Sequence, residues 1–111
     1  MREGSKMAEY RVKGPPAWQP SHPGVLLREV ILPALHLTVK DAAEKLGISR
    51  QTLHAILSGK SAVTPEMAVR LGKFCGDGPG IWLRMQQAHD LWAAERGMAE
   101  AIKKIPTMRA A

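Results

Sequence analysis

One segment constrains the fold of this chain more than any other, because two short amphipathic stretches meet there at a single glycine, Gly47. Thr38 and Ser49 are each suited to cap the start of a helix, and Asp41 completes a capping-box spacing after Thr38. Gly47 tolerates the left-handed backbone that a tight turn needs. Ala43 is small enough for two helices to cross closely. The pattern predicts two helices of about eight residues that meet near a right angle.

The second of these helices has one apolar face and one polar face. Leu53 and Ile56 form the apolar face, which we expect to be buried. Arg50 and Gln51 begin the polar face, and their side chains can pair with guanine and adenine edges respectively. Free backbone N–H groups at the two helix starts suit phosphate oxygens. We therefore predict a helix-turn-helix that binds DNA through Thr38, Lys40, Ser49, Arg50, Gln51, Thr52, His54, Ala55, Ser58 and Lys60.

Charge supports a polyanionic partner. The 111 residues carry a formal net charge of +6, and basic proteins attract nucleic acids through their field. No acidic residue occurs between Glu44 and Glu66, whereas Lys45, Arg50 and Lys60 all fall there. The basic stretch therefore coincides with the predicted helix-turn-helix.

The rest of the chain also has helical signals. A helix is expected from Pro23 to its end at Pro33, another from the Thr64 cap to Gly76, a long one over residues 81–96, and a weaker one over 98–105. No stretch alternates with a period of two. We predict an all-α protein with a flexible arm over residues 1–22, a five-helix domain over 23–96 and a partly helical tail over 97–111.

Four sequence blocks resemble HigA-type antitoxins, in the Xre/Cro-like helix-turn-helix family. The blocks are HPGVLLRE at 22–29, GISRQTL at 47–53, SGK at 58–60 followed by TPEMAVRL at 64–71, and IWLRMQQAHDLW at 81–92. The resemblance covers about residues 22–95. It implies a lambda-repressor-like fold and a dimeric repressor of its own toxin–antitoxin operon. It also implies a HigB-like toxin partner, an endonuclease that cuts mRNA at the ribosome.

The chain departs from that family at two places. Related repressors often have Gln directly after the cap of the first motif helix, where this sequence has Val39. Lys40 is expected to compensate in part for the missing phosphate contact. Arg84 and Met85 replace the usual Asn-Leu pair, which bears on the dimer surface.

The long helix carries a second candidate site. Trp82, Met85, His89 and Trp92 recur at spacings of three, four and three, so they share one side of a helix. We predict that this seam forms the homodimer interface, which would present two recognition helices to successive turns of the DNA major groove. The alternative, left open by spacing alone, is that these residues belong to the core.

Other functions are less well supported. The four histidines are scattered and the single cysteine, Cys75, has no CxxC partner, so we expect no metal site and no cofactor. Nothing resembles a secretion signal or an apolar membrane span, which favours the cytoplasm. Three alternatives remain: a solitary repressor without a toxin, an interaction module that no longer binds DNA, and an enzyme such as a nuclease.

Overall fold

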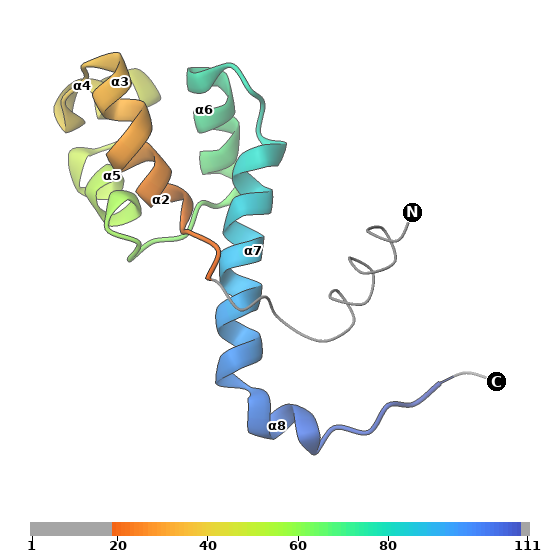
Figure 1. Ribbon diagram of the computed structural model, residues 1–111. Coiled ribbons are helices and arrows are strands. Elements are labelled where there is room, and N and C mark those ends of the chain that lie inside the picture. Colours follow the sequence, from red (N-terminus) through yellow and green to blue (C-terminus); the bar gives the residue numbers. More distant parts are fainter. Residues whose placement is uncertain (1–18, 110–111) are drawn as a thin grey trace, which may run out of the picture. The chain divides into compact units, whose positions relative to one another are not determined.

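The computed structural model describes residues 19–109, and every regular element in that range is helical (Figure 1). This confirms the predicted all-α class. Of the predicted arm over residues 1–22, only 19–22 are described. In chain order the elements are α2 (Pro23–Leu26), the π-helical turn η1 (Leu27–Ile31), α3 (Leu32–Leu35), α4 (Val39–Leu46), α5 (Arg50–Leu57), α6 (Pro65–Cys75), α7 (Gly80–Gly97) and α8 (Ala99–Lys103).

The chain divides into two compact units, one of residues 20–89 and one that includes residues 90–109. The first unit holds the core, to which helices α2 to α7 contribute. Its buried apolar residues are Leu27, Leu32, Ala42, Ala43, Leu46, Leu53, Ile56, Leu57, Val63, Met67, Ala68, Leu71 and Trp82. Among residues 19–109, no helix combines the length and apolar character that a membrane span requires.

The first helix is longer than predicted, and the expectation that Pro33 ends it is wrong. α2, η1 and α3 follow one another without a break, and the helix ends at His36 in a left-handed conformation with φ of 54°. The N–H of Leu32 donates to the carbonyl of Leu27, five residues back. This widened turn precedes Pro33, which lies at the start of α3. A proline ring usually clashes with the carbonyl one turn earlier, and a π turn displaces that carbonyl.

The predicted caps of the helix-turn-helix are confirmed. Thr38 accepts a hydrogen bond from the backbone N–H of Asp41, and Ser49 accepts one from that of Thr52. Gly47 has a φ of 74° and ends α4. The local signals predicted these features because each depends on residues no more than a few positions apart.

Two glycines allow segments of backbone to approach more closely than any other residue would. A Cβ on Gly24 would collide with the carbonyl oxygen of Ile56, so α2 packs directly on the backbone of α5. A Cβ on Gly72 would collide with the backbone of Gly78. The first contact fixes α5 against the first helix, and the second fixes the turn after α6.

The start of α7 belongs to the core of the first unit. Trp82 is 0% exposed, and its indole N–H donates to a carboxylate oxygen of Asp77 at 3.0 Å. The buried Gln86 accepts a hydrogen bond from the backbone N–H of Val63 at 2.7 Å. In the second unit, the guanidinium of Arg96 lies 4.7 Å from the ring centre of Trp92. α7 is therefore anchored to the core by its first two turns.

Candidate DNA-binding surface

The two faces of α5 differ as the sequence predicts. Leu53, Ile56 and Leu57 are buried, with Leu53 only 1% exposed. The predicted polar-face residues are exposed, except that Ala55 is half-buried; they are Ser49, Arg50, Gln51, Thr52 and His54. The helix therefore presents a polar ridge to solvent while its other side is fixed in the core.

The first turn of α5 is ordered by its own cap. The Ser49 Oγ accepts from the Thr52 backbone N–H at 3.0 Å and donates to the Thr52 Oγ1 at 2.8 Å. Arg50 and Gln51 make no side-chain hydrogen bond to any residue within 19–109, and their backbone N–H groups lie in the first turn, where no intrahelical acceptor exists. Both their side chains and their amides can meet an external acceptor.

The other predicted contacts surround this helix. Thr38 and Lys40 are exposed at the start of α4. After α5, the backbone N–H of Lys60 donates to the carbonyl of Ala55 at 2.9 Å, which folds the loop back while leaving the Lys60 side chain exposed. Ser58 is exposed at the end of α5. A hollow of about 260 Å³ brings Val39 together with His54 and Ser58, so the start of α4 lies beside the second half of α5.

Two arginines hold this surface in place, and sequence reasoning assigned neither of them that role. The Arg28 guanidinium donates to the carbonyl of Leu57 at 2.8 Å and so caps the end of α5. The Arg70 guanidinium donates to the carbonyl of Leu46 at 2.8 Å, at the turn between α4 and α5. Arg28 lies 29 positions from Leu57 and Arg70 lies 24 from Leu46. Spacing gives no signal for contacts across such distances.

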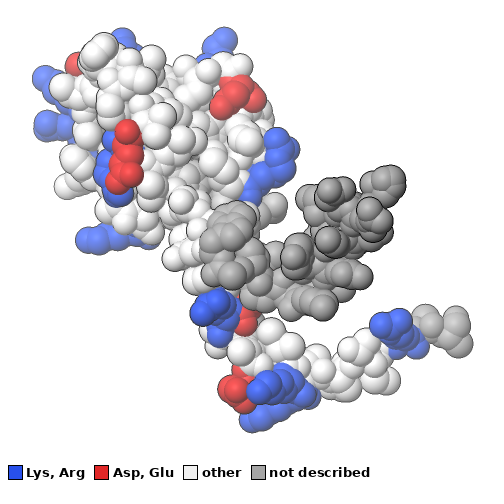
Figure 2. Space-filling view, in the orientation of Figure 1, with Lys and Arg blue, Asp and Glu red and all other residues white. Residues whose placement is uncertain are grey.

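The charge of this surface favours an anion. The first turn of α5 contains no acidic residue. Figure 2 shows blue Lys and Arg side chains, with red acidic side chains among them, on the side of the molecule where Figure 1 places α4 and α5. Free N–H groups and cations on one face are the features that bind a phosphate backbone.

The predicted dimer seam is not one continuous surface. Trp82 is buried against its own chain, so it is a core residue and cannot form an interface with a second copy. Met85 is half-buried and packs on the same core. His89 Nδ1 lies 2.9 Å from the carbonyl oxygen of Pro20, and its ring contacts that of His22 edge to face. Trp92 is half-buried beside Arg96. Helical spacing alone could not separate these environments.

Metal ligation and thiol reactivity can be assessed for the described residues. No group of three or more His, Cys, Asp or Glu side chains within residues 19–109 is arranged to hold a metal ion. Burial raises the pKa of the Cys75 thiol above its usual value, and the nearby Asp77 carboxylate raises it further. The thiol is therefore protonated at neutral pH, which makes it a poor nucleophile.

Comparison with known proteins identifies the fold family. A family model described as helix-turn-helix matches residues 27–83, which runs from the first helix to the start of α7. The chain belongs to this helix-turn-helix family. Within it, the protein is 37% identical to virulence-associated protein A of Dichelobacter nodosus over 89 residues, which covers 79% of this chain and 87% of that protein. It is also 31% identical to antitoxin HigA-1 of Vibrio cholerae over 85 residues, covering 77% and 80% of the two chains.

Solved structures of the same fold include antitoxins. An addiction module antidote protein of the HigA family from Coxiella burnetii superposes with a TM-score of 0.76 at 33% identity, covering 83% of this chain and all of that one. Antitoxin GraA, solved in complex with its operator, gives a TM-score of 0.77 at 30% identity and covers 86% and 97%. This helix-turn-helix protein is thus similar to DNA-binding antitoxins over most of its length.

Proposed function

We propose that this protein is the antitoxin of a type II toxin–antitoxin system, which binds the operator of its own operon as a homodimer and neutralises a HigB-like mRNA endonuclease. The observation that carries the proposal is the first turn of α5. There Arg50 and Gln51 are exposed on a helix whose opposite face is locked into the core. The proposed site of action is the cytoplasm, and the proposed activity is binding without catalysis.

The assigned DNA contacts fall into two classes. Arg50, Gln51, Thr52, His54 and Ala55 lie on the outer face of α5 and are assigned to base edges in the major groove. The remaining residues are assigned to the phosphate backbone and contribute affinity rather than sequence information; they are Thr38, Lys40, Ser49, Ser58 and Lys60.

The antitoxin assignment rests on similarity. The relatives and solved structures that resemble this chain include proteins named as antitoxins, and GraA was solved with its operator. Several relatives are instead described only as helix-turn-helix transcriptional regulators, among them proteins of Haemophilus influenzae and Escherichia coli. These names favour a second candidate, a solitary repressor without a toxin partner.

The test of DNA binding is an electrophoretic shift assay with the promoter upstream of the gene. We expect Arg50→Ala to weaken promoter binding by about 1–3 kcal/mol and to relax specificity at one base position. Lys60→Ala is the matched comparison, because a lost phosphate contact weakens promoter and random duplex alike and lowers the salt slope by about one unit. Equal losses on promoter and random DNA for Arg50→Ala would contradict its assignment to base reading.

Co-purification separates the two candidate functions. If a short reading frame beside the gene encodes the toxin, its product should associate with this protein at micromolar concentration and lose its toxicity on co-expression. A protein that binds the promoter but no neighbouring product would be a solitary repressor. The two halves of the proposal therefore fail independently.

A further inference from the structure

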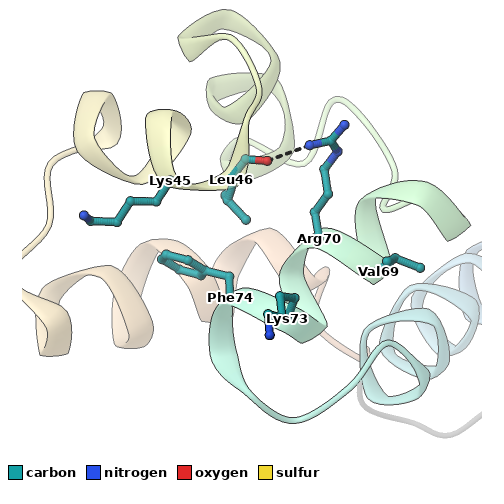
Figure 3. A pocket seen from close by; sticks show the side chains of 6 residues that line it. All are labelled: Lys45, Leu46, Val69, Arg70, Lys73 and Phe74. Carbon is teal, nitrogen blue, oxygen red and sulfur yellow. Dashed lines mark hydrogen bonds between the residues drawn. The ribbon is translucent and has the colours of Figure 1, made fainter.

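A groove between α4 and α6 is lined by none of the residues assigned to DNA contacts. It has a volume of about 310 Å³ and is lined by Lys45, Leu46, Val69, Arg70, Lys73 and Phe74 (Figure 3). Lys45 and Leu46 come from the last turn of α4, whereas Thr38 and Lys40 lie at its beginning. α4 has eight residues, so its two ends are separated by about 12 Å. A ligand in this groove would leave the start of α4 uncovered.

The floor of the groove is apolar. The apolar side chain of Val69 is 59% exposed, although α6 contributes other apolar residues to the core. The half-buried Phe74 supplies further apolar surface, whereas Leu46 is 4% exposed and belongs to the core. Figure 3 shows Lys45 and Phe74 extending toward the same end of the groove, while Val69 lies toward the other end. Covering exposed apolar surface of this kind with a partner side chain removes it from water, which favours binding.

The surface next to the groove is also hollowed. A second hollow of about 460 Å³ is lined by Val69, Lys73 and the glycine-rich turn after α6. Val69 and Lys73 line both hollows, so the two hollows lie on either side of these residues. The two residues are one helical turn apart on α6 and lie on the same side of it. A segment that crosses Val69 and Lys73 would reach both hollows.

The cations of the groove lack carboxylate partners in the part of the chain that the structure describes. Lys45, Arg70 and Lys73 form no ion pair with any carboxylate within residues 19–109. No acidic residue lines either hollow. Arg70 uses one nitrogen to hold the carbonyl of Leu46, as Figure 3 shows. The groove therefore combines an apolar floor with a positive rim.

We propose that this groove binds an acidic amphipathic segment of a partner protein, with an apolar side chain over Val69 and carboxylates beside Lys45 and Lys73. A protein segment fits better than a nucleic acid, because a phosphate backbone has no apolar side chain to cover Val69 and Phe74. Helical segments commonly dock in this way, with apolar anchors in a groove and charges at its rim. The proposal goes beyond operator binding and does not depend on it.

The test uses a defined probe. A fluorescein-labelled helical peptide of about twelve residues would carry leucines on one face and glutamates beside them, and a second peptide would have glutamine in place of every glutamate. Fluorescence anisotropy with the full-length protein should show binding of the acidic peptide, weakened by added salt because surface charges are screened. The glutamine peptide should bind at least about tenfold more weakly, which corresponds to one unit in log Kd.

Variants locate the site. The double variant Val69→Gln and Lys73→Gln should weaken binding of the acidic peptide by about tenfold or more. In the wild type, addition of the peptide should shift the NMR amide signals of α6 rather than those of α5. Val30→Gln with Lys104→Gln is the matched control, because Val30 is 56% exposed and Lys104 is exposed, yet neither lines the groove. This control should bind the peptide as the wild type does, and both variants should keep the circular dichroism spectrum of the wild type.

Three results would overturn the proposal. The first is no binding of the acidic peptide at millimolar concentration. The second is equal weakening by the groove variant and the control. The third is a pair of results: random-sequence duplex DNA displaces the peptide, and the groove variant no longer binds the duplex. Together these would show that the groove binds DNA. Loss of promoter binding by Arg50→Ala with unchanged peptide binding would leave this proposal standing.

Discussion

At the scale of single residues, Gly47 and Arg70 act together at the turn between α4 and α5. The glycine supplies a left-handed backbone, and the arginine satisfies the carbonyl that the end of α4 leaves without an intrahelical partner. A Cβ on Gly47 would lie 2.8 Å from the Arg70 guanidinium nitrogen. A substitution at this position therefore has two costs, one from the backbone and one from the displaced arginine.

Gly47→Ala should lower the free energy of unfolding more than Gly76→Ala does. Both glycines have positive φ, so each alanine costs about 1–2 kcal/mol in backbone strain. Nothing lies within 4 Å of a Cβ on Gly76, whereas the Gly47 variant also weakens the Arg70 hydrogen bond, at a further cost of about 1 kcal/mol. Urea denaturation measures the difference. Equal losses would show that Arg70 relaxes without cost.

The Cys75 thiol gives a prediction that depends on pH. Because burial and the Asp77 carboxylate raise its pKa, the thiolate fraction at a given pH is lower in the native protein than in the unfolded chain. The midpoint of the alkylation rate against pH should therefore lie higher in the native state than in urea. Asp77→Asn keeps the oxygen that accepts from Trp82 but removes the charge, and should lower the native midpoint. An unchanged midpoint would rule out the carboxylate as a cause.

At the scale of the elements, the structure separates what local sequence determines from what it does not. The caps at Thr38 and Ser49 and the turn at Gly47 were predictable, because each depends on neighbours within a few positions. The continuation of the first helix past Pro33 was not predictable, because it depends on a π turn. The spacing of the apolar residues does not indicate such a turn. The role of Arg28 was hidden for another reason, since its acceptor lies on a distant helix.

The candidate site divides in the same way. The exposed face of α5 followed from the positions of Leu53 and Ile56. The environment of the α7 seam could not be predicted in this way, because a spacing of three and four residues fits both a core face and an interface. Trp82 occupies the core although it shares that spacing with Trp92.

Packing between the first helix and α5 predicts a strong effect at Gly24. Gly24→Ala would place a Cβ against the carbonyl oxygen of Ile56, which belongs to rigid helical backbone. We expect a loss of about 3 kcal/mol in the free energy of unfolding, because the two helices must separate. Gly97→Ala is the control, since nothing lies within 4 Å of its Cβ. Thermal denaturation should show a lower midpoint for Gly24→Ala only, and similar midpoints would contradict the close packing.

At the scale of the whole molecule, operator binding by the proposed mechanism needs two copies of the recognition helix about one turn of DNA apart. Trp82 is excluded from the interface, which leaves the later part of α7 as the candidate. Leu91 is 60% exposed there, beside Trp92. We therefore assign the proposed contact with a second copy to this exposed leucine and the half-buried tryptophan beside it.

Trp92→Ala and Leu91→Asp should each shift the sedimentation profile toward the monomer, because each removes apolar area from the proposed interface. Val30→Asp is the control for a new charge at a comparably exposed apolar site in the other unit. If all three variants sediment as the wild type does, the dimer forms through another surface. Monomeric variants should also lose promoter affinity while each copy keeps its weak affinity for random duplex.

The attachment of α5 to the first helix has a consequence for specificity. Its carbonyl end is held by Arg28, and its backbone is in contact with Gly24, so the helix has little freedom to tilt toward a poorly fitting duplex. In the proposed complex the nucleic acid must then adapt its groove width and curvature to the protein. Sequences that bend easily at the centre of the site would bind more tightly even where no side chain reaches a base, since the elastic cost of deforming the duplex differs between sequences.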